Sequence, residues 1–160
     1  TTCAIQKLQI CLLFKSTLES SEHQFFPLQF IYKVIFRLLK EIRHIEISRT
    51  TQIGEGLYIS HAYNIIINPN AILGKNINIH RGDSLDKQIG GEMKNPVIGN
   101  EVWIGINAAI VGKVTIGDDV LIAPNSYVNC DVPSHSIVFG NPCIIKHRED
   151  ATEGYINRRV

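Results

Sequence analysis

The sequence predicts an all-β solenoid of short stacked strands, preceded by a short helical region. Aliphatic side chains recur every six residues from residue 47 onward, whereas apolar residues before residue 45 recur at helical spacing. Hydrophobic residues make up 44% of the 160 residues, which excludes a disordered chain. The predicted divisions are a helical region at 1–45, a solenoid at 46–133 with a loop at 86–97, and a C-terminal tail at 134–160.

Charge and cysteine content narrow the class of protein. The 16 Lys and Arg against 15 Asp and Glu argue against a nucleic-acid partner, which usually requires a basic excess. The cysteines form no CxxC pair, which predicts a reducing, cytoplasmic location without a disulfide framework or a zinc ribbon. Cys143 is expected to be a small buried hydrophobe. The four cysteines are Cys3, Cys11, Cys130 and Cys143.

Two N-terminal segments, 4–15 and 25–43, are predicted to be helical. In the second, apolar residues recur every four positions, at Phe26, Phe30, Val34, Leu38 and Ile42. Such a helix packs against the rest of the protein or a partner subunit, or lies as a basic amphipathic helix on a membrane surface. The apolar runs are too short and too often interrupted for a membrane span, and no signal peptide is expected.

The six-residue period indicates strands that repeat the same inward-facing positions. Small residues such as Gly99 and Gly117 often follow the aliphatic place, and Asn or Asp residues allow the chain to turn. One rung cannot bury its apolar side alone, so stacked rungs must share one core. The step is kept by Ile47, Ile53 and Ile59, by Ile67, Leu73, Ile79 and Leu85, and by Ile98, Ile104, Ile110, Ile116, Ile122 and Val128.

These residues carry a resemblance to a known family. Residues 98–103 (IGNEVW) and 116–120 (IGDDV) resemble the hexapeptide repeats of left-handed parallel β-helix acyltransferases. Residues 53–61 (IGEGLYISH) and 131–142 (DVPSHSIVFGNP) are similar to the serine acetyltransferase group. The resemblance implies a left-handed parallel β-helix, a homotrimer with active sites between subunits, and acetyl transfer from acetyl-CoA to a hydroxyl, that of serine as in cysteine biosynthesis.

The first break in the period contains His61. Eight residues rather than six separate Ile59 from Ile67, and His61 stands where the resembled family carries its catalytic histidine. A neutral imidazole removes a hydroxyl proton near neutral pH, and a carboxylate beside it fixes its tautomer. Glu46 occupies the place of the family's orienting aspartate. The alternative for His61 is a solvated turn residue or a structural histidine. The alternative for Glu46 is a surface charge on the first rung.

The expected acceptor-binding residues are Ser60, Lys94 and Asn95, and all three depart from the resembled group. Ser60 replaces an aspartate, and Lys94-Asn95 replaces Arg-His at the end of the long loop. Lysine lacks the fork that grips a carboxylate, and asparagine cannot act as a base. A sugar or glycan hydroxyl is therefore the alternative acceptor to serine.

The resemblance implies that acetyl-CoA lies along a groove between neighbouring coils. Gly105-Ile106 and Ala123-Pro124 stand at the matching turns, 18 residues apart. Pro124 has no amide hydrogen to donate. Lys146 and Arg148 are candidates for the CoA phosphates, with a solvated basic tail as the alternative.

Two other functions compete with acetyl transfer. Some left-handed β-helices bind zinc through histidines and act as carbonic anhydrases, but this chain has no HxxxH or HxxxxH pair. His61 and His80 also fall at different places of the repeat, so they are not expected to point alike, and no metal is expected. A non-catalytic scaffold is the second competitor, because the fold does not by itself determine function.

Overall fold

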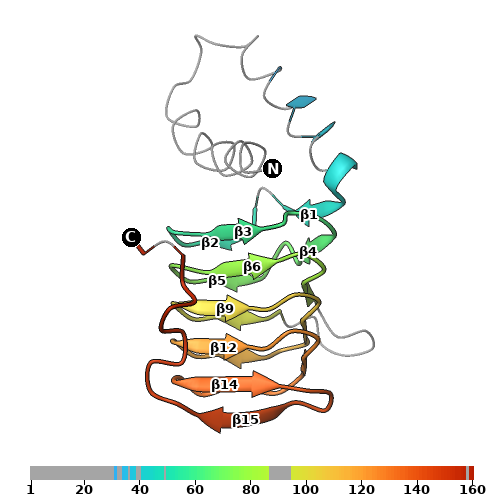
Figure 1. Cartoon of the computed structure of the whole chain (residues 1–160). Helices are drawn as coiled ribbons and strands as arrows, with labels where there is room; N and C mark the ends of the chain where they lie inside the picture. The colour runs from blue at the N-terminus through green and yellow to red at the C-terminus, as the bar shows by residue number, and fades with distance from the viewer. Residues whose placement is uncertain are drawn as a thin grey trace.

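A computed structural model describes residues 31, 34–35, 37–38, 41–48, 50–86, 95–157 and 159–160. Its strands wind into a solenoid with three sheets, one on each side (Figure 1). Sheet A holds β1 (Ile45–Ile47), β4 (Ile65–Ile67), β7 (Ser84–Asp86), β10 (Ala109–Val111) and β13 (Tyr127–Val128). Sheet B holds β2 (Gln52–Ile53), β5 (Ile72–Leu73), β8 (Val97–Ile98) and β11 (Thr115–Ile116). Sheet C holds β3 (Tyr58–Ser60), β6 (Asn78–His80), β9 (Val102–Ile104), β12 (Val120–Ile122), β14 (Ser136–Phe139) and β15 (Ile144–His147).

The predicted inward places form the core. Each of the repeating aliphatic residues is buried except Ile53, which is half-buried and packs against the others. Equivalent residues stack in parallel register, as in Ile79 beside Ile104 and Ile104 beside Ile122. The predicted stacking of rungs around one shared core is therefore confirmed.

The corners need small or turn-forming residues, as predicted. Asn76 takes a positive φ angle of 57° where sheet B meets sheet C, and Asn107 and Asn125 both take 59° on adjacent coils where sheet C meets sheet A. At Gly99 a Cβ would lie 2.5 Å from Asp118 Oδ1 and 2.7 Å from the backbone of Gly117 on the next coil. The absent side chain allows neighbouring coils to approach within one strand spacing.

The segment before β1 is helical where the structure describes it. Ile31, Val34–Ile35, Arg37–Leu38 and 41–43 have helical conformation, which agrees with the C-terminal part of the predicted helix at 25–43. The predicted helix at 4–15 lies outside the described residues. Ile31, Leu38 and Ile42 are 53%, 54% and 66% exposed in the isolated chain. In the described part of the chain, no helix has the length and apolarity needed to cross a membrane.

The solenoid extends beyond its predicted end at residue 133. β14 pairs in parallel with β12, and β15 then turns back and pairs with β14 in antiparallel fashion. The six-residue step did not predict β14, because the residues of this strand do not continue the series of aliphatic residues spaced six apart. Residues 136–139 are therefore part of the last coil rather than of a tail.

The true C-terminal tail folds back along the solenoid. It runs from β15 past the outer side of sheet C and ends near β2 and β3 (Figure 1). The amide of Val160 donates to Asn76 Oδ1 at 3.0 Å, and Arg159 pairs with Glu101 at 3.3 Å. Asn78 Nδ2 donates to the carbonyl of Tyr155 at 3.0 Å. The tail thus bridges the second coil to the last.

Asp119 is the main anchor of this tail. Its carboxylate accepts hydrogen bonds from the amides of Ala151 and Thr152 at 2.8 and 2.9 Å, and from the Thr152 hydroxyl at 2.7 Å. His135 Nδ1 contacts the same carboxylate at 2.9 Å. Burial opposes ionisation of Asp119, but the hydrogen bonds from Thr152, Ala151 and His135 outweigh it and lower its pKa. The hydrogen bond to Asp119 raises the pKa of His135.

The inward stack can be tested at Ile110, which is fully buried on β10. Ile110→Ala leaves a cavity that the coils above and below cannot fill, and we expect it to lower the free energy of unfolding by about 2–5 kcal/mol. Ile144→Ala is the control, because Ile144 is 52% exposed. Urea unfolding would measure both, and equal losses would contradict the shared core.

The tail anchor should depend on pH. The raised folded-state pKa of His135 means that its stabilisation is fully present below its unfolded value of 6.5 and is lost as the pH rises through the higher folded value. We expect wild type to be more stable than His135→Asn at pH 5.5, with a smaller difference at pH 9. Asparagine suits this control because it tolerates the φ of 57° at this position. An equal difference at both pH values would contradict an ionic contribution.

Candidate functional site

The candidate site lies where sheet C meets sheet A, an edge that we call the C–A corner (residues 61–64, 81–83, 105–108 and 123–126). His61 follows β3 directly, and its side chain is exposed. Its φ of 51° places it in the left-handed region, which non-glycine residues adopt at some cost. A reactive imidazole at this place stands outside the core, in reach of a substrate.

The predicted cofactor residues come to the same corner. Gly105 and Ala123 lie on adjacent coils, and a Cβ at Gly105 would lie 2.7 Å from Pro124 N and 2.8 Å from Trp103 Cζ3. The amides of Gly105 and Ala123 already donate to the carbonyls of Ile122 and Val138. Pro124 has no amide hydrogen, so among these positions Ile106 carries the N–H that donates to no acceptor in the described part of the chain. A ligand at this corner could therefore accept a hydrogen bond from the N–H of Ile106.

His80, the last residue of β6, lies next to this corner and close to His61, which the six-residue step did not predict. His80 lies beside Ser60 in parallel register, one place before the level of His61. The two histidines occupy different places, as expected, yet they are close enough for the charge of His61 to act on His80. Counting from Ile59 and Ile79, which stack, would have shown that Ser60 and His80 lie side by side.

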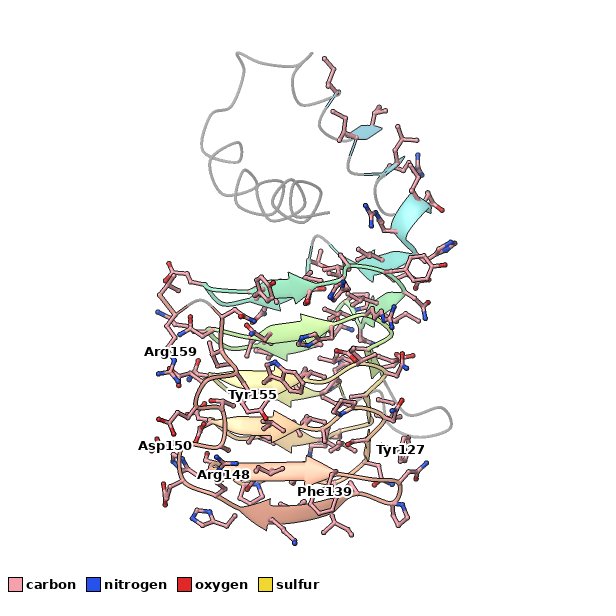
Figure 2. All side chains as sticks on the ribbon, viewed as in Figure 1. Tyr127, Phe139, Arg148, Asp150, Tyr155 and Arg159 are labelled. Carbon is pink, nitrogen blue, oxygen red and sulfur yellow. The ribbon has the colours of Figure 1, made fainter. Side chains whose placement is uncertain are left out.

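The ring of His80 is held on several sides. Nδ1 lies 2.7 Å from the carbonyl oxygen of Ile104, and the Trp103 ring lies against it with centroids 4.7 Å apart. Tyr155 of the tail packs edge-on against Trp103 at 5.2 Å. Figure 2 shows Tyr155 lying over the strands of sheet C. Burial lowers the pKa of His80, the hydrogen bond with Ile104 opposes this change, and the charge of His61 lowers the pKa further.

Asp83 fixes the backbone beneath this histidine. Its side chain is fully buried and accepts hydrogen bonds from the amide of His80 at 2.9 Å and from the amide of Ala108 at 3.0 Å. Burial raises the pKa of Asp83 to about 8, although both hydrogen bonds favour the ionised form. The group is thus mainly protonated at neutral pH and ties two neighbouring coils together.

Glu46 lies on the outer face of sheet A and makes no hydrogen bond to His61 in the chain described. It lines a hollow of about 630 Å³ together with His44, Asn64 and Asp86, and His61 is not part of that lining. The expected pairing of Glu46 with His61 is therefore not formed in the isolated chain.

The expected acceptor residues do not gather at one corner. Ser60 is half-buried at the end of β3, next to His61. Asn95 precedes β8, at the edge where sheet A meets sheet B, which is a different corner of the solenoid. Lys94 lies outside the described residues. One chain by itself does not bring Asn95 to His61.

The last coil carries the remaining candidates. Lys146 is exposed on β15, with Nζ 5.7 Å from the centre of the Phe139 ring, and the amide of Arg148 donates to the carbonyl of His135. Cys143 packs against the core, as expected, but only half-buried, and its sulfur lies 3.7 Å from that of Cys130. The proximity of these two free thiols was not predicted, because the cysteines lie 13 residues apart in the sequence.

Metal-ligating side chains do not cluster in the residues that the structure describes. No group of three or more His, Cys, Asp or Glu residues is placed to hold an ion there. Structural and catalytic zinc sites use three or four such ligands.

The titration of Asp83 predicts a pH effect on stability. Its folded-state pKa of about 8 lies above the unfolded value of 3.8, so the stability it contributes is fully present below pH 3.8 and is lost as the pH rises through about 8. Between pH 6 and pH 9 we expect the free energy of unfolding of wild type to fall by on the order of 2–3 kcal/mol more than that of Asp83→Asn. Chemical unfolding at the two pH values would measure this. Parallel losses in the two proteins would show that Asp83 does not titrate in this range.

Comparison with known proteins supports one family. The family described as "Bacterial transferase hexapeptide (six repeats)" matches residues 95–130. Serine acetyltransferase 2 of Arabidopsis thaliana is 35% identical over 107 residues, which cover 65% of this chain and 32% of the relative. The serine acetyltransferase of Helicobacter pylori is 33% identical over 115 residues, covering 70% of this chain and 66% of the relative.

Solved structures agree with these relatives. The serine acetyltransferase of Neisseria gonorrhoeae in complex with serine is 30% identical, with a TM-score of 0.65 over 88% of this chain and 54% of that one. The soybean serine acetyltransferase apoenzyme is 25% identical, with a TM-score of 0.67 over 89% of this chain and 56% of that one. The chain spans from 32% to 66% of the length of these relatives. It belongs to the hexapeptide-repeat acyltransferase family, with the left-handed parallel β-helix of that family, and within it resembles the serine acetyltransferases.

Proposed function

We propose that the protein is an acetyl-CoA-dependent O-acetyltransferase of the serine acetyltransferase kind. The observation that carries this proposal is the exposed imidazole of His61 at the C–A corner, the same edge of the solenoid on which Gly105 and Ala123 lie two and three coils further along. The similarity to serine acetyltransferases supports the same chemistry. Serine is the proposed acceptor, as the first step toward cysteine.

The reaction is a direct transfer without an acyl-enzyme. The acceptor oxygen attacks the thioester carbonyl while neutral His61 takes the hydroxyl proton. The tetrahedral intermediate then collapses, the carbon–sulfur bond breaks, and the imidazolium returns the proton to the departing CoA thiolate. One O–acetyl bond replaces one S–acetyl bond, and His61 ends as it began.

We propose that the working site forms between subunits of a homotrimer. In one chain, Asn95 and His61 lie at different corners, so Lys94 and Asn95 would reach the acceptor beside Ser60 only from a neighbouring chain. Exposed apolar residues before β1, including Ile31 and Ile42, also favour burial against another copy. Glu46 is proposed to orient His61 in this assembly.

Acetyl-CoA is proposed to lie along the C–A corner. The free N–H of Ile106 is the main backbone donor for its pantetheine arm, and Pro124 contributes its carbonyl instead. Lys146, and less directly Arg148, would meet the phosphates from the last coil. A cytoplasmic location remains a prediction that rests on the cysteine pattern.

The role of His61 can be tested by thiol release from acetyl-CoA. We expect His61→Ala to lower kcat by about 100-fold or more, because a general base contributes about 10²–10⁴-fold. The melting temperature should stay unchanged, since the side chain is exposed. His147→Ala on the last coil is the matched control and should keep full activity. A rate for His61→Ala within twofold of wild type would rule out the base assignment.

The acceptor can be identified in the same assay with serine, homoserine and a panel of sugars. We expect thiol release with serine. Thiol release only with sugars would show that the acceptor is a sugar hydroxyl rather than serine. No acetyl-CoA binding at all would favour a non-catalytic scaffold.

A further inference from the structure

His80 lies between the proposed acceptor and donor positions. Its register partner on one side is Ser60, and on the other side the strand pairing of Ile79 with Ile104 brings His80 level with Gly105. Ser60 belongs to the proposed acceptor side and Gly105 to the proposed donor side. A group at this level therefore stands where the two substrates must meet.

The hydrogen bond at Nδ1 determines the tautomer of His80. The carbonyl oxygen of Ile104 can only accept, so Nδ1 must carry the proton. In the neutral ring Nε2 then presents a lone pair. Nε2 has no hydrogen-bond partner in the described part of the chain, and it is not among the buried polar atoms sealed from solvent. It is an open acceptor beside His61.

The surroundings keep this acceptor in place and uncharged. Asp83 holds the backbone amide of His80, Trp103 holds one face of the ring, and Tyr155 supports Trp103 from the tail. Burial and the nearby His61 both disfavour a second positive charge on His80, which lowers its pKa. Functional side chains are commonly held by such a second layer of contacts.

We propose that His80 is a second imidazole of the active site, whose Nε2 accepts a hydrogen bond from a donor group of the acceptor substrate while His61 removes the hydroxyl proton. The inference rests on the proposed acetyl transfer. The donor group is an ammonium or a second hydroxyl next to the reacting one, as in an amino alcohol, a hydroxy amino acid or a sugar. His80 thus contributes to acceptor specificity, and its support by Tyr155 gives the C-terminal tail a role at the site.

Two substitutions separate this role from a structural one. The amide nitrogen of asparagine stands near the place of Nδ1, so His80→Asn keeps the bond to Ile104 but loses the acceptor at Nε2. The amide oxygen of glutamine stands near Nε2, so His80→Gln keeps an acceptor there but loses the bond to Ile104. His147→Asn, at an exposed position of the last coil, is the control.

Steady-state thiol-release kinetics with the acceptor that wild type uses would test the proposal, together with melting temperatures. We expect His80→Asn to raise the KM for the acceptor by about tenfold or more, the usual effect of losing one hydrogen bond to a charged or polar group. The KM for acetyl-CoA should stay within about twofold of the wild-type value. The melting temperature should stay within a few degrees of that of wild type. His80→Gln should recover part of the affinity for the acceptor.

The opposite pattern would overturn the proposal. A normal acceptor KM in His80→Asn, or a greater loss in His80→Gln accompanied by a lower melting temperature, would make His80 purely structural. Either result would leave the proposed acetyl transfer unaffected, because both are measured against a wild-type protein that is active. If none of the tested acceptors causes wild type to release thiol from acetyl-CoA, the acetyltransferase proposal itself fails, and the role of His80 fails with it.

Discussion

The structure depends on one constraint, which is that no coil can bury its aliphatic side chains without the coils above and below it. The strands are two to four residues long, too short to be stable alone. Their inward residues pack directly on equivalents one coil away, as Ile104 does on Ile79 and Ile122. Neighbouring coils must therefore approach to one strand spacing everywhere, which excludes a side chain at Gly99 and Gly105.

This close stacking leaves the outward places and the corners available for function. His61 extends from a corner without disturbing the core, and His80 uses an outward place on sheet C. Buried carboxyl groups support both features: Asp83 joins two coils below His80, and Asp119 holds the tail against the solenoid. The rigid stack thus supports a site whose side chains come from different coils.

The repeat and the histidine were accessible to sequence reasoning because both are local. A strict six-residue step predicts strands and turns, and an eight-residue rung marks His61 as unusual. The end of the solenoid was placed too early, because β14 is joined to β12 by pairing rather than by the step. The long loop also hid the fact that Asn95 returns to a different corner from His61.

The sequence by itself determined which residues point inward, where the chain turns and which family it resembles, since these follow from spacing over six residues. Only the tertiary structure decided which outward residues meet. Ser60 lies beside His80, Asp119 binds Thr152, and Cys130 lies near Cys143. The two residues of each pair lie 13 to 33 positions apart in the sequence. Because the coils differ in length, this separation does not by itself predict which residues lie side by side. Such contacts arise only when the coils are stacked, so the second imidazole of the proposed site became visible in the fold and not in the repeat.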